Sequence, residues 1–484
     1  MAKKSLGKEA IILTTSKVIV MIIGMVSSML LSRFRTLEEY GTYSQLILTI
    51  QLSISIFTFG LPNAINYFLV NTEVLESKKK FLSIYYTLST LLSILIGIVL
   101  LLFSPVISSY FQNDSIMAYL YVFALLPWTI VISSSIENVL IVYGKTKVLL
   151  YYRVSNSIML LLAIIVSTIF KFSFNLYLII YTSIQCFFAL IVYMLVQNIV
   201  GKLKMTLDKK LIIKIVKFSV PIGLSTMVGT IGIELDKLVI GYFFNTEELA
   251  IYTNAAREMP ITIISASLSA VLMPKLIQAL KNNKIQRTIN LWGNSITVSY
   301  IFICFFVTVL FVFAAPIISL LYSEKYLPGI AIFRIYSLIL LLRVTYFGMI
   351  LNSVGKTKFI FYSSIFSLVL NFILNIVFLK VLGLNGPAIA TFIAVLAINL
   401  VQLKFTCKEL SIKFSKIFPW KDLMKISILN IILGFFFITI QKILLSYFLS
   451  ELLLSVLLGG IWFIVYILII KSLLKRNWEH LNNY

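Results

Sequence analysis

Long apolar runs without a charged residue are the feature that most constrains this chain. Residues 81–103 and 452–470 contain no Asp, Glu, Lys or Arg, and about twenty helical residues cross a hydrocarbon core of about 30 Å. The sequence is 60% hydrophobic and 12% charged, which is more apolar surface than a soluble core can bury. These patterns predict an all-α polytopic membrane protein.

Apolar runs separated by charged breaks predict about fourteen transmembrane helices. Most of the 41 Lys and Arg residues lie in every second loop. These loops lie on the same side of the membrane as the N-terminus. Because positive loops stay in the cytoplasm, both termini are expected there. The net charge of +23 then reflects topology and not a nucleic-acid partner. The predicted helices begin near residues 10, 40, 82, 116, 150, 175, 214, 250, 291, 331, 359, 387, 424 and 452.

The chain contains an internal repeat with a spacing of about 210 residues. The pair Glu38-Glu39 recurs as Glu247-Glu248, GKTK at residues 144–147 recurs at 355–358, and PVIS at 105–108 recurs as PIIS at 316–319. We therefore expect two parallel six-helix lobes, residues 1–200 and 201–410, followed by two additional helices and a tail in residues 411–484. Two such lobes can rock around a shared cavity to give alternating access. A duplicated scaffold without transport is the alternative.

Charged residues inside predicted helices mark the candidate site. Each costs about 2.5–3.5 kcal/mol at a helix centre, so it normally faces a partner or a cavity. Residues 233–260 hold most of them, and we expect Asp236 or Glu234 to pair with Arg257, and Lys237 with Glu258, across two helices. A structural role for these pairs is as compatible with the sequence as a role in transport. The full set is Lys17, Glu137, Glu234, Asp236, Lys237, Arg257, Glu258, Arg334 and Arg343.

Arg257 and Arg343 are the strongest candidates for cations in a cavity, and Lys17 is the third. Arg334 lies near an outer helix end, where its side chain can reach the interface. Arg343 lies about thirteen residues into the same helix, too deep to do so. Glu234, Asp236, Lys237, Glu258 and Glu137 are candidates for ion pairs or for coupling to a cation gradient.

The sequence lacks the motifs of nucleotide-binding proteins, metal-binding proteins and enzymes. A phosphate-binding loop needs a glycine where Val139 and Ile350 stand before the two GKT segments. The three cysteines and His480 form no metal-binding pattern, so no metal or cofactor is expected. An enzyme such as a polysaccharide polymerase would need a long outer loop with catalytic residues, and the predicted topology has none.

Several segments resemble, in order, the pattern of bacterial polysaccharide-biosynthesis flippases of the multidrug/oligosaccharidyl-lipid/polysaccharide exporter superfamily. They include LSRFRTLEEYGTYSQLI, FGLPNAINYFL, VLMPKL and GLNGPAIATFIA. The resemblance covers nearly the whole chain. It implies two six-helix lobes plus two helices, and movement of an undecaprenyl-diphosphate-linked oligosaccharide to the outer leaflet of the bacterial cytoplasmic membrane.

The resemblance also implies a site and partners. The cationic cavity of such flippases would correspond to Arg257, Arg343 and Lys17, which would hold the diphosphate. A monomer working beside a polysaccharide polymerase and glycosyltransferases, driven by a sodium or proton gradient, would fit. Flippases for peptidoglycan-lipid or teichoic-acid precursors, and cation-coupled drug antiporters of the same superfamily, remain alternatives.

Overall fold

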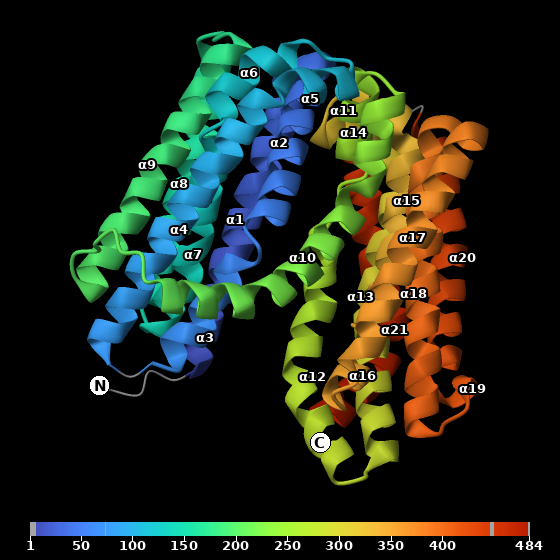
Figure 1. Ribbon diagram of the computed structural model, residues 1–484. Helices are drawn as coiled ribbons and strands as arrows, with labels where there is room; N and C mark the ends of the chain where they lie inside the picture. The colour runs from blue at the N-terminus through green and yellow to red at the C-terminus, as the bar shows by residue number, and fades with distance from the viewer. Residues whose placement is uncertain (1–5, 73, 446–449, 483–484) are drawn as a thin grey trace. The chain divides into compact units, whose positions relative to one another are not determined.

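A computed structural model describes residues 6–72, 74–445 and 450–482 of the chain. The described residues form helices and no strands, which confirms the predicted all-α class (Figure 1). The chain divides into two compact units, Met1–Ala250 and Ile251–Tyr484. Each unit is described by itself.

The first unit contains the N-terminal helices and the long helix α10. Within it, the first half of α10 runs nearly horizontally in the view of Figure 1, and the helix then turns upward. The elements are α1 (Leu6–Phe34), α2 (Leu37–Phe57), η1 (Leu61–Asn63), α3 (Ala64–Val70), α4 (Leu75–Leu102), α5 (Ser104–Phe111), α6 (Ser115–Phe123), α7 (Leu126–Val142), α8 (Thr146–Ile169), α9 (Phe174–Val200) and α10 (Lys209–Phe243).

The second unit begins within α11 and ends with the two additional helices. Trp462 of α21 stacks on Phe437 of α20 with ring centroids 5.2 Å apart, and Tyr466 donates a hydrogen bond to the Ile301 carbonyl of α13 at 2.9 Å. The additional helices therefore share an apolar core with α13. The elements are α11 (Thr246–Ala255), η2 (Pro260–Thr262), α12 (Ile263–Lys281), α13 (Ile285–Val312), α14 (Ala314–Leu321), η3 (Glu324–Gly329), α15 (Ile330–Leu341), α16 (Met349–Ser353), α17 (Thr357–Leu382), η4 (Gly383–Asn385), α18 (Gly386–Leu410), α19 (Phe414–Ile417), α20 (Trp420–Leu444) and α21 (Glu451–Asn482).

The predicted repeat is visible in matching helix starts. Thr36 and Glu39 form a capping box before α2, with bonds of 3.1 and 3.2 Å between each side chain and the other's backbone N–H. Asn245 and Glu248 form the same reciprocal pair before α11, at 2.8 and 3.2 Å. Such a box satisfies two backbone donors that the helix leaves free. The repeated acidic pairs therefore start equivalent helices.

The repeated GKTK segments also have one local structure. Gly144 and Gly355 both have positive φ, 65° and 76°. The following lysines, Lys145 and Lys356, each donate a backbone hydrogen bond of 2.8 Å to a carbonyl five residues earlier. This geometry ends one helix and starts the next one, as glycine with positive φ allows. Both segments are turns between helices. This agrees with Val139 and Ile350 standing where a phosphate-binding loop would need glycine.

The structure does not confirm fourteen separate spans. Among the described residues, ten helices are long and apolar enough to cross a membrane, or up to twelve if two bent pairs each count as one span. The difference arises partly because helices are broken: α15 and α16 are too short individually, and residues 342–348 between them are irregular. The molecule is nevertheless a multi-pass membrane protein.

Two broken helices meet inside the first unit. The α2 span bends by 60° before η1 and α3, and Phe59 and Gly60 have positive φ at this break. Gly60 lies against Gly223 of α10, where an added Cβ would lie 2.4 Å from the Phe59 carbonyl carbon. Pro221 in the same turn of α10 removes one helical donor. The two backbones therefore touch where both helices are interrupted.

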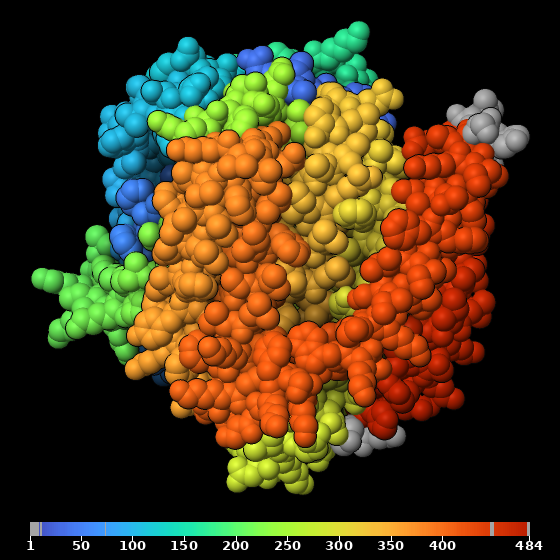
Figure 2. Space-filling view, turned by 90° about the vertical axis from the view of Figure 1, so that its right-hand side faces the viewer, coloured from blue at the N-terminus to red at the C-terminus, as the bar shows by residue number. Residues whose placement is uncertain are grey.

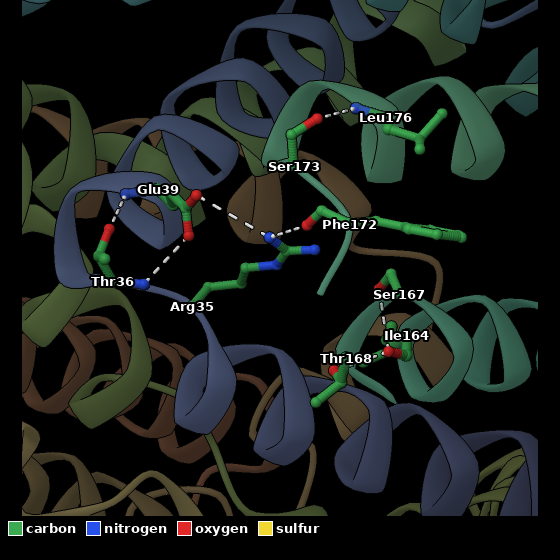
Figure 3. A network of polar contacts seen from close by, with 9 residues as sticks. All are labelled: Arg35, Thr36, Glu39, Ile164, Ser167, Thr168, Phe172, Ser173 and Leu176. Carbon is green, nitrogen blue, oxygen red and sulfur yellow. Dashed lines mark hydrogen bonds and ion pairs between the residues drawn. The ribbon is translucent and has the colours of Figure 1, made fainter. Parts of the chain in front are cut away.

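Arg35 fixes one end of the first unit (Figure 3). Its Nη1 donates to the Phe172 carbonyl oxygen at 3.0 Å and lies 3.9 Å from Glu39 Oε1. The guanidinium also lies 5.4 Å from the ring centroid of Tyr177. These contacts join the turn between α1 and α2 to the turn between α8 and α9, far apart in the sequence.

Asp208 gives this unit a pH-sensitive contact. Its carboxylate lies 2.6 Å from Lys80 Nζ and accepts a hydrogen bond from the Leu211 backbone N–H. The bond from Lys80, followed by the bond from Leu211, lowers the pKa of Asp208. A carboxyl with a lowered folded pKa contributes stability above its unfolded pKa of about 3.9 and loses that contribution as pH falls through the folded value.

We therefore expect Asp208→Asn to lower the midpoint of thermal unfolding slightly near neutral pH, because asparagine still caps α10 but cannot pair with Lys80. The difference from the unmodified protein should shrink toward zero as the pH falls below the folded pKa. A difference that stays constant across this range would contradict the assignment.

Candidate functional site

Three helices of the first unit bring together one acidic and two basic side chains. Lys17 Nζ of α1 lies 3.4 Å from Glu137 Oε1 of α7, and Arg153 of α8 pairs with Glu137 Oε2. Lys17 and Glu137 were predicted from the sequence. Arg153 is not among the residues predicted from the sequence, and it lies about two turns into α8.

The first cluster carries an excess positive charge. Two cations share one carboxylate, and the Lys17 side chain remains 63% exposed. Arg153 Nη1 is buried and has no hydrogen-bond partner among the described residues. Glu137 therefore compensates two cations, one of which is partly removed from solvent.

Replacing Glu137 with glutamine is expected to destabilise the protein by about 1–3 kcal/mol, because a partly buried arginine loses its charged partner. Thermal unfolding in detergent measures this effect. Glu247→Gln, at an exposed carboxylate, is the matched control and should change stability by less than about 0.5 kcal/mol. Equal effects of the two changes would contradict the role of Glu137.

The second unit contains two breaks in its helices. One lies in residues 256–259, between α11 and η2, and the other in residues 342–348, between α15 and α16. At the second break, Asn399 Nδ2 donates to the Leu342 carbonyl at 2.7 Å, and Ser265 Oγ donates to the Arg343 carbonyl at 2.8 Å. Neighbouring helices thus satisfy carbonyls that lipid could not.

The two breaks are joined by an ion pair. Arg343 Nη2 lies 2.6 Å from Glu258 Oε1, and the two side chains are 41% and 31% exposed. Arg257 precedes Glu258 in the same irregular segment; its side chain is exposed and makes no ion pair within the described residues. Two arginines and one carboxylate at irregular backbone give this second cluster an excess positive charge.

The remaining predicted residues lie on α10 and α15. Lys237 pairs with Glu234 at 2.7 Å, one turn away on the same helix. Asp236 lies on α10 between them. The sequence predicts that Asp236 or Glu234 pairs with Arg257, and Lys237 with Glu258. These pairs would join residues of different units, so they stay predictions. Arg334 donates to the Phe311 carbonyl at 3.0 Å, a structural contact that leaves it outside the cluster.

We also searched the described residues for possible metal ligands. No group of three His, Cys, Asp or Glu residues there could hold a metal ion. Cys304 is buried and the other two cysteines are partly buried, all three as free thiols. The charged groups of the helix interiors are therefore the candidate site.

Comparison with known proteins identifies the family. Residues 30–331, more than half of the chain, match the family described as "Polysaccharide biosynthesis protein". The chain belongs to this family. A stretch of 206 residues is also 23% identical to the probable low-salt glycan biosynthesis flippase Agl15 of Haloferax volcanii, and covers 42% of this chain and 43% of that relative. The matched stretch spans less than half of that relative's length.

Solved structures share the fold of this polysaccharide biosynthesis protein. The lipid II flippase MurJ in its inward closed conformation has a TM-score of 0.77 at 19% identity, covering 96% of this chain and 99% of MurJ. An inward-facing multidrug resistance MATE transporter of the MOP superfamily has a TM-score of 0.65 at 17% identity, covering 81% and 94%. These structures confirm the predicted all-helical fold, and the family match confirms the predicted polysaccharide-biosynthesis family.

Proposed function

We propose that this polysaccharide biosynthesis protein is a flippase that moves an undecaprenyl-diphosphate-linked oligosaccharide from the inner to the outer leaflet of a bacterial cytoplasmic membrane. The family and the flippase named among its relatives support this class of activity. The protein would work by alternating access and without catalysis, with both termini in the cytoplasm. A sodium or proton gradient acting on Glu137, Glu234 or Asp236 would supply the energy.

Arg257 carries the proposal. A diphosphate entering a low-dielectric site needs compensating charge, and a guanidinium offers several hydrogen-bond donors in one plane. Arg257 is exposed at irregular backbone and is not neutralised by an ion pair in the described chain. Arg343 lies at the facing break, where Glu258 holds it. Lys17 is the corresponding exposed cation of the first cluster.

The test is movement of a fluorescent lipid-diphosphate saccharide across the bilayer of proteoliposomes. Arg257→Ala is expected to lower the initial rate about tenfold or more, since a hydrogen bond to a charged group is worth about 1.5–3 kcal/mol. Arg257→Lys should recover part of the rate by keeping the charge. Thermal unfolding should be nearly unchanged, because Arg257 makes no ion pair with any residue that the structure describes.

Arg334→Ala is the matched control. It removes another arginine of the second unit whose contact is with a backbone carbonyl, and the flipping rate should stay within about twofold of the unmodified protein. Normal flipping by a folded Arg257→Ala variant would show that the site assignment is wrong.

A further inference from the structure

The segment from residue 201 to residue 217 forms a distinct basic element, here called the basic arm. It contains the loop after α9 and the first turns of α10. In the space-filling view, the green part of the chain near residue 200 projects outward (Figure 2). The arm exposes six lysines: Lys202, Lys204, Lys209, Lys210, Lys214 and Lys217.

The basic arm is held firmly on its own unit. Ile215 is completely buried, and Leu211 and Phe218 pack against the same core of buried residues. Asp208 caps α10 and pairs with Lys80 at the start of α4. The Lys204 backbone N–H is 3.4 Å from Ser83 Oγ. The lysines are therefore presented by a fixed surface, which lowers the entropy lost on binding.

The start of α10 has three stripes with different chemistry. Residues three and four apart share a helix face, so Leu211, Ile215 and Phe218 form the stripe that packs on the unit. Lys210, Lys214 and Lys217 form a second stripe at the same spacing. Ile213 and Val216, 44% and 39% exposed, lie on a third.

Charge and apolar exposure together define the partner. Met205 is 85% exposed and Leu207 66% exposed, so apolar side chains also project from the loop between the lysines. Lys78, Lys79 and Lys80 at the start of α4 add positive charge beside the arm, and Asp208 and Glu76 are the only carboxylates within residues 74–80 and 201–217. An element with both properties lies in the interface of an anionic membrane.

We propose that the basic arm is a binding surface for anionic phospholipid headgroups in the leaflet on its own side of the membrane. Lys210, Lys214 and Lys217 would contact the lipid phosphates, and Met205, Leu207, Ile213 and Val216 would enter the boundary between headgroups and acyl chains. None of these side chains belongs to the two charged clusters described above. The inference does not depend on what the protein transports.

The direct test places a fluorophore on the arm. Met205→Cys is labelled with an environment-sensitive dye after the three native cysteines are replaced by alanine, and the full protein is reconstituted in vesicles of phosphatidylcholine. Spin-labelled phosphatidylglycerol should quench the dye at least about twice as strongly as spin-labelled phosphatidylcholine, and added salt should remove the preference.

The triple variant Lys210→Gln, Lys214→Gln and Lys217→Gln should bring the two quenching efficiencies close to equal. The control removes the same charge at exposed lysines of the second unit, Lys281→Gln, Lys284→Gln and Lys358→Gln, and should keep the preference. Equal quenching by both lipids in the parent, or no quenching by either, would overturn the proposal.

A second measurement needs no cysteine replacement. The parent and both triple variants are purified in detergent from vesicles with equal amounts of phosphatidylglycerol and phosphatidylcholine, and retained lipid is determined by mass spectrometry. The ratio of phosphatidylglycerol to phosphatidylcholine should fall at least about twofold for the arm variant alone. The same ratio in all three proteins would contradict the proposal.

Discussion

Gly223→Ala should prevent the first unit from packing correctly and should lower the yield of folded protein sharply. The added Cβ would lie 2.4 Å from the Phe59 carbonyl carbon and 2.6 Å from the Gly60 nitrogen. These are backbone atoms, so no side chain can rotate away. Overpacking of this kind costs about 1–3 kcal/mol and more where neighbours cannot move. Size-exclusion profiles and thermal unfolding in detergent measure the loss.

Gly229→Ala is the matched control for this change. Gly229 lies on the same helix, and a Cβ there would meet nothing within 4 Å. Alanine also favours a helix more than glycine does, by about 1 kcal/mol, so this variant should be as stable as the unmodified protein or slightly more so. Equal loss in both variants would mean that the contact of Gly223 with Phe59 and Gly60 is not close-packed.

Arg343→Ala is expected to abolish most flipping and also to destabilise the protein. The change removes a cation of the proposed site and breaks its ion pair with Glu258. Breaking a solvent-exposed ion pair costs up to about 1 kcal/mol, and both side chains here are partly exposed. The initial flipping rate should fall about tenfold or more, and the unfolding midpoint should fall with it.

The double variant Arg343→Ala, Glu258→Gln separates the two effects. Neutralising Glu258 should restore much of the stability, because the side chain that faced Arg343 then carries no charge. Flipping should stay low, because the cation is still missing. Recovery of flipping together with stability would show that Arg343 serves only to hold the fold.

The repeat and the helical class could be predicted because they depend on local sequence. Hydrophobic run length sets the spans, and the acidic pairs at Glu39 and Glu248 form the caps that start equivalent helices. The pairing of Lys237 with Glu234 could also have been predicted from the sequence. Residues three apart share a helix face, and this contact competes with a pair between helices.

The helix break in residues 342–348 could not be predicted from the sequence. Residues 342–348 contain no proline, and the break is stabilised by Asn399 and Ser265 from helices far away in the sequence. The pairing of Glu258 with Arg343 depends on this tertiary arrangement. Arg153 was not predicted as a site residue because it closely follows the basic GKTK turn in the sequence. In the structure it lies on α8 and pairs with Glu137.

The central claim is tested most directly by the unmodified protein in proteoliposomes given two substrates side by side. One is a fluorescent polyprenyl-diphosphate saccharide, and the other is a fluorescent organic cation of the kind that drug antiporters export. Our account predicts that the protein moves the lipid-linked saccharide across the bilayer well above the rate of protein-free liposomes and leaves the cation distribution unchanged. Transport of the cation, with saccharide movement no faster than in protein-free liposomes, would contradict it.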